Sequence, residues 1–236
     1  MWGHHGICSI IAASLIHKLS RSEGRLGATV EARLSSINNL MDIHYSKFPV
    51  SARMPKLKDS NLLSEGGWAT LHGPVVKAAN CRHLHGFLVE LANAFCDAVE
   101  PHPAAVEHTS IRKVCCSLDK FYNILYGGDM FLTLPEWTEL DACVRRLGRH
   151  MQLLRSIAET QNMPHWHMPP KTHYGQHWPE QCMLINSRYV QTYGFESFIG
   201  VLTKIWESAC NGPFSNGQQF TVCVKFLVLF ILANNL

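Results

Sequence analysis

The chain has 236 residues, of which 47% are hydrophobic and 17% charged, a composition typical of a globular protein. This excludes a chain that is disordered throughout. Lys and Arg number 21 against 18 Asp and Glu, and a net charge of +3 does not by itself indicate a nucleic-acid-binding or membrane-surface protein. Any basic surface must therefore be local.

Cysteine usage indicates a reducing compartment. The nine cysteines form no Cys-x-x-Cys motif, so we expect most thiols to be small buried hydrophobes and the protein to be intracellular. The apolar stretch at 6–16 is not preceded by Lys or Arg, which argues against a secretion signal. The apolar stretch at 220–233 is interrupted by Lys225 and is shorter than the roughly 20 residues of a spanning helix, so we expect no membrane span.

Apolar residues recur at helical spacing along most of the chain, and the first two helices are predicted at 7–19 and 30–45. The segment 46–74 is rich in Pro and Gly and has no apolar run as long as a helix or strand, which predicts a long loop. The predicted organisation is an N-terminal helical hairpin at 1–45, a linker or long loop at 46–74, and a main helical domain at 75–236.

The remaining helices are predicted at 75–99, at 107–126, from a capping box at 133–136 to 157, and at 193–210. The terminal segment 220–233 fits either a helix or a strand. We therefore predict a mainly α fold, an irregular bundle of about seven helices. Its core should include residues that share the apolar helix faces: Leu84, Leu88, Leu91, Phe121, Leu140, Val144, Leu147 and Leu154.

Short motifs of phosphate loops, dinucleotide folds, serine hydrolases and zinc proteases are absent from the sequence. His, Trp and Pro are instead concentrated at 164–179. His173 and His177 are one helical turn apart and are the candidate zinc ligands, with His165, His167 or Cys182 as a further ligand. Zinc needs three or four convergent ligands, however, and spacing alone does not show convergence, while the flanking prolines disfavour a helix. We expect these side chains to cap the helical body and bind loop carbonyls, without zinc.

Two further groups of residues are candidates for binding. Glu196 lies near the start of a predicted helix, where it would cap the helix or serve as a Mg²⁺ ligand. Arg145, Arg146 and Arg149 share one region of a long helix, as a solvated face or as a face that contacts phosphates.

Four short runs carry a resemblance to known proteins: KAANCRH at 77–83, LYGGDMFLT at 125–133, PKTHYGQH at 170–177 and FESFIG at 195–200. In this order they resemble a multicopy family of uncharacterised dinoflagellate proteins over most of the chain. More distantly, they resemble the C-terminal part of DDE transposases of the CACTA class.

Those transposases use two Asp and one Glu in an RNase H-like core to bind Mg²⁺ for DNA strand cleavage and transfer. Glu196 corresponds to the Glu, and Lys171 in the PKTH run becomes a candidate for nucleic-acid contact. The sequence departs from the family because no strands carry the two Asp, and Asn80 stands where an acidic residue is expected. Magnesium is therefore expected only if a complete site exists.

The resemblance implies a non-catalytic or remnant transposase-like helical module that contacts nucleic acid or a protein partner. Such a protein would be intracellular, and nuclear if its partner is nucleic acid. The alternative is an all-α scaffold or interaction protein with no nucleic-acid role. In that case His173, His177 and Glu196 have only a structural role in the core.

Overall fold

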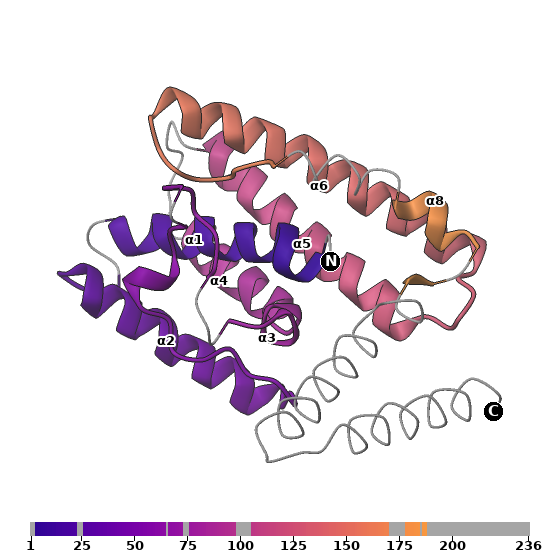
Figure 1. Cartoon of the computed structure of the whole chain (residues 1–236), viewed down its shortest axis with the longest axis horizontal. Helices are drawn as coiled ribbons and strands as arrows, with labels where there is room; N and C mark the ends of the chain where they lie inside the picture. The colour runs from indigo at the N-terminus through magenta and orange to yellow at the C-terminus, as the bar shows by residue number, and fades with distance from the viewer. Residues whose placement is uncertain are drawn as a thin grey trace, which may run out of the picture. The chain divides into compact units, whose positions relative to one another are not determined.

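The computed structural model describes residues 3–22, 26–64, 66–72, 76–97, 105–169, 178–184 and 186–187. These residues form a mainly helical protein with seven α-helices and no strand, which confirms the predicted fold class (Figure 1). The chain divides into two compact units, Met1–Tyr189 and Val190–Leu236. The helix predicted at 193–210 and the helix or strand predicted at 220–233 lie in the second unit, outside the described residues. No helix of the described part is long and apolar enough to cross a membrane.

The α-helices are α1 (Ser9–Arg21), α2 (Val30–Lys47), α3 (Ala78–Arg82), α4 (His85–Asp97), α5 (Ala105–Gly127), α6 (Leu134–Thr160) and α8 (Trp178–Cys182). A π-helical turn, η1 (Gly3–Cys8), precedes α1, and a 3₁₀ turn, η2 (Asp59–Asn61), follows α2. The helix predicted at 75–99 is two helices, because the chain turns between Arg82 and His85. Helix α8 was not predicted.

Helices α5 and α6 form a long hairpin, and α4 packs against α5 (Figure 1). The predicted capping box begins α6: the Thr133 amide donates to Glu136 Oε2 (2.8 Å), and the Glu136 amide donates to Thr133 Oγ1 (3.4 Å). These bonds satisfy amides that would otherwise lack partners at the first turn. The side-chain and backbone bonds from Thr133 lower the pKa of Glu136.

The core follows the apolar helix faces. All eight residues predicted to be buried are at most 4% exposed, and they come from α3–α4, α5 and α6. Helix α1 is buried on nearly every side, from Ser9 to Ser20, and packs on α2, α4 and α5. Buried apolar side chains from several helices form one contiguous core.

The segment after α2 contains no α-helix between Phe48 and Lys77 in the residues described there. It nonetheless packs inward, because Met54, Leu57 and Leu62 are at most 4% exposed. The Asn38 side chain on α2 makes two hydrogen bonds with the backbone of Leu57. It donates to the Leu57 carbonyl and accepts from the Leu57 amide, both at 2.9 Å. The predicted loop is therefore held on the helices by specific hydrogen bonds.

Candidate functional site

The three arginines predicted to contact nucleic acid lie on α6. Arg145 and Arg149 are exposed and Arg146 is half-buried. Arg145 Nε already donates to Asp141 Oδ2 at 2.7 Å, one turn earlier on the helix. Arg146 and Arg149 have no ion-pair partner among the described residues.

Helix α5 adds a cation beside these arginines. The His150 ring on α6 lies against α5, with Nδ1 3.3 Å from Ser110 Oγ. Burial lowers the pKa of His150, and the charges of Lys113, Arg149 and Arg146 lower it further. Lys113 is exposed and, within the described part, has no ion-pair partner. We call Lys113, Arg146, Arg149 and His150 the basic surface.

Several other cations on this hairpin pair with neighbouring carboxylates. Lys120 Nζ lies 2.8 Å from Glu139 Oε1 across the two helices, and Arg155 Nε lies 2.7 Å from Glu159 Oε1 along α6. Lys113, Arg146 and Arg149 therefore differ from these cations, because no carboxylate of the described residues pairs with them. Sequence reasoning singled out Arg146 and Arg149 from their place in one region of a long helix, but it missed Lys113, which tertiary packing brings near them.

Four further candidate residues belong to parts of the chain that the structure does not describe. Lys171, His173, His177 and Glu196 lie outside the described residues, so their proposed zinc, magnesium and nucleic-acid contacts stay predictions. Among the residues that are described, no three His, Cys, Asp or Glu side chains are grouped to hold a metal ion.

A carboxylate–histidine pair joins α4 to α5. His85 Nδ1 is 2.6 Å from Asp119 Oδ1, and Asp119 Oδ2 accepts from Asn123 Nδ2 at 3.0 Å. The His85 ring stacks on Tyr122 with centroids 5.1 Å apart. A carboxylate orients general-base and metal-binding histidines in this way. Here the pair links two helices, and the described residues supply no metal-binding group around it.

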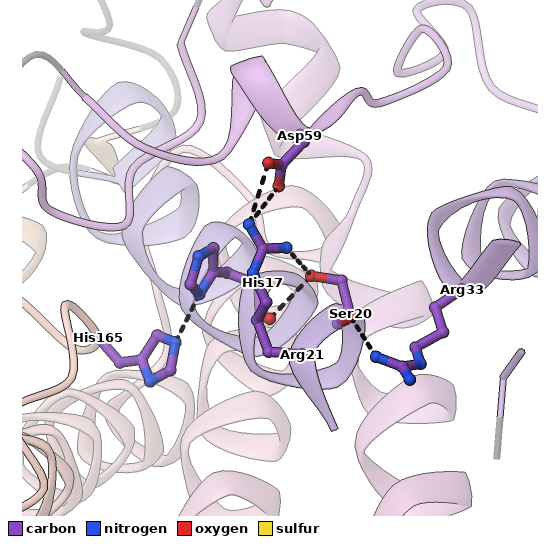
Figure 2. Close-up of polar contacts among 6 residues, drawn as sticks. All are labelled: His17, Ser20, Arg21, Arg33, Asp59 and His165. Atoms are coloured by element: carbon purple, nitrogen blue, oxygen red, sulfur yellow. Dashed lines mark hydrogen bonds and ion pairs between the residues drawn. The ribbon is translucent and has the colours of Figure 1, made fainter. Parts of the chain in front are cut away.

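A second histidine pair is buried, and the sequence analysis did not find it. His17 Nδ1 on α1 lies 2.8 Å from His165 Nε2, in the segment after α6 (Figure 2). The two residues are 6% and 3% exposed. Burial, followed by the charges of His17, Lys18 and Arg21, lowers the pKa of His165 to about 3. Burial and Arg21 also lower the pKa of His17, while Asp59 acts in the opposite direction.

Polar contacts hold the C-terminal end of α1 next to this pair. Arg21 Nη2 donates to both Asp59 oxygens, at 2.8 and 3.0 Å. Arg21 Nη1 donates to Ser20 Oγ at 3.1 Å, and Arg33 Nη1 donates to the Ser20 carbonyl at 3.1 Å (Figure 2). These bonds hold in place the end of the helix that carries His17.

Comparison with known proteins adds no family to these observations. The resemblance to the dinoflagellate proteins and to CACTA-class transposases stays a prediction. No family model, no curated protein and no solved structure matches this chain.

Proposed function

We propose that this chain is a helical binding module that contacts the phosphate backbone of nucleic acid through the basic surface and is not catalytically active by itself. The observation that carries the proposal is the packing of His150 against α5, which brings Lys113 together with Arg146 and Arg149 around one imidazole. These three cations have no ion-pair partner among the described residues. Like charges held together repel, and a phosphate backbone relieves that repulsion while it releases counterions.

This mode of binding is independent of base sequence. Backbone contacts from Lys and Arg give affinity and orientation, whereas sequence is read by hydrogen bonds to base edges. Each phosphate contact contributes a slope of about −0.9 to the dependence of log affinity on log salt for duplex DNA. The salt slope therefore measures how many cations of the surface take part.

Replacing Arg146 and Arg149 together with Gln should weaken binding to a duplex DNA of arbitrary sequence and reduce the salt slope by about 2. Fluorescence anisotropy over a series of salt concentrations measures both quantities. The matched control replaces Arg145 and Arg155 with Gln, because it removes the same net charge from residues already paired with carboxylates. Equal effects of the two double variants would contradict the assignment of the surface.

DNA binding should also strengthen as the pH falls, because of His150. In the free protein, burial and neighbouring cations lower the pKa of His150. A bound phosphate favours the imidazolium, so the pKa rises in the complex and the protein takes up a proton on binding. Affinity should therefore increase by up to about tenfold per unit as the pH falls between the two pKa values, and level off below the lower one.

The pH series is measured with the same anisotropy assay at constant ionic strength. His150→Gln should flatten the dependence, whereas His83→Gln should leave it unchanged. His83 is a suitable control because burial also lowers its pKa, but it lies on the turn between α3 and α4. A pH dependence that persists in His150→Gln would exclude His150 as its source.

One observation favours the alternative, a scaffold that binds a protein. Large apolar side chains are exposed near the α5–α6 turn: Met130, Phe131 and Leu134 there, and Met183 and Leu184 after α8. A backbone hydrogen bond links the segment after α8 to the α5–α6 turn, since the Asn186 amide donates to the Met130 carbonyl at 2.7 Å. Contiguous exposed apolar groups mark interaction surfaces. Absence of salt-dependent DNA binding by the wild-type protein would leave this alternative.

A further inference from the structure

The segment 164–168, which follows α6, lies on α1 and is here called the strap. The Trp166 amide donates to Ser14 Oγ on α1 at 2.9 Å, and the Pro164 carbonyl accepts from the Ala69 amide at 2.8 Å. The Trp166 side chain is fully buried, but its indole Nε1 has no hydrogen-bond partner. Its backbone φ is +58°, a left-handed conformation that is strained for a bulky residue. Docking must offset this strain.

The histidine pair is a contact between a side chain of the strap and a side chain of α1. A distance of 2.8 Å between His17 Nδ1 and His165 Nε2 leaves room for one hydrogen between the two nitrogens. One ring must donate, and the other must keep its lone pair. When both rings carry two protons, two N–H groups face each other and the hydrogen bond is replaced by repulsion.

Asp59 favours the charged form of His17, but the cations around the pair act against an added proton. Lys18 and Arg21 are the nearby cations, and both act to disfavour the charged form of His165. The nearby carboxylates are already paired, Asp59 with Arg21 and the buried Glu107 with Lys18 at 2.8 Å.

A third imidazole, that of His167 in the strap, has a similar environment to the pair. His167 stacks on Trp68 with centroids 4.7 Å apart, and its buried Nδ1 has no hydrogen-bond partner. Burial lowers its pKa, and the charge of Arg155 on α6 lowers it further. In the segment that contains Trp68, His72 also has a ring nitrogen, Nε2, that is buried without a partner.

We propose that the His17–His165 pair is a proton-sensitive latch that holds the strap on α1, and that acid opens the strap before the helices unfold. The proposal is independent of nucleic-acid binding, since none of these residues belongs to the basic surface. Histidine protonation operates conformational switches in this way when a buried imidazole must remain neutral for one state to persist.

The direction of the effect follows from the proton counts. With the strap open and solvated, the three histidines have ordinary pKa values near about 6.5, whereas with the strap closed all three values are lower. The closed state therefore binds fewer protons. Closure is most stable above about pH 6.5 and weakens as the pH falls toward the lowered values, by up to about tenfold per unit for each proton taken up.

Hydrogen exchange of single backbone amides, measured by NMR on the full chain at several pH values, tests the latch. The protection factors of the Ala69 and Trp166 amides should fall by at least about tenfold between pH 6.5 and 5. Those of Cys115 and Leu118, in the core of α5, should not. The double variant His17→Gln, His165→Gln keeps hydrogen-bonding side chains that do not titrate. It should make the decrease clearly smaller, because only His167 then takes up a proton on opening.

The control is His44→Gln, since His44 on α2 is as buried as His17 but faces Glu90. It should leave the pH dependence of the strap unchanged. Loss of protection by α5 and strap amides together, or strap protection that does not change with pH, would overturn the latch. If the double variant does not fold, the wild-type imidazole resonances decide: titration of His17 and His165 near pH 6.5 while the strap amides remain protected overturns it equally.

Discussion

Leu88→Ala is expected to lower the free energy of unfolding by about 2–5 kcal/mol. Leu88 is fully buried on α4, a helix that packs on both α1 and α5. The substitution removes buried apolar atoms and leaves a cavity that the surrounding helices fill only in part, because protein interiors are close-packed. Urea unfolding followed by circular dichroism should show a lower midpoint with an unchanged slope.

The control for this substitution is Leu153→Ala on α6. Leu153 is 40% exposed, so its removal should change the free energy of unfolding by no more than about 0.5 kcal/mol. Similar effects at the two positions would mean that Leu88 is not part of a closely packed core.

Local patterns predicted most of the helices. The spacing of apolar residues places α2, α5 and α6 to within a few residues of their ends, and the Thr133 capping box identifies the first turn of α6. Periodicity did not find the break between α3 and α4, because Leu84, in the turn between them, is as deeply buried as the helical residues that follow it. It also did not find α8, which has five residues and shows little more than one turn of any pattern.

Contacts between distant segments could not be predicted in the same way. His17 and His165 are 148 positions apart, and no sequence motif connects them. The one available signal was a histidine directly after the apolar run at 10–16, within the first predicted helix, where a polar side chain requires a buried partner. Lys113 was missed for a related reason, since its relation to Arg146 and Arg149 depends on how α5 packs against α6.

For the segment after α2, the sequence likewise predicted the local structure but not the contacts with the helices. Its Pro and Gly content predicted an irregular chain, but not which groups would hold it in place. Asn38 supplies that restraint from α2, since its amide is paired in both directions with the backbone of Leu57. The Tyr45 hydroxyl adds a second restraint by accepting from the Met54 amide at 3.2 Å, and burial raises the pKa of Tyr45 to about 12.

Asn38→Ala should therefore destabilise the protein by about 2–6 kcal/mol, because it leaves the Leu57 amide and carbonyl buried without partners, each at about 1–3 kcal/mol. Asn39→Ala is the matched control, since the adjacent side chain has the same chemistry but is exposed. Urea unfolding measures the difference, and hydrogen exchange should show the Leu57 amide losing protection in Asn38→Ala alone. Equal stability of the two variants would mean that other contacts hold the segment on α2.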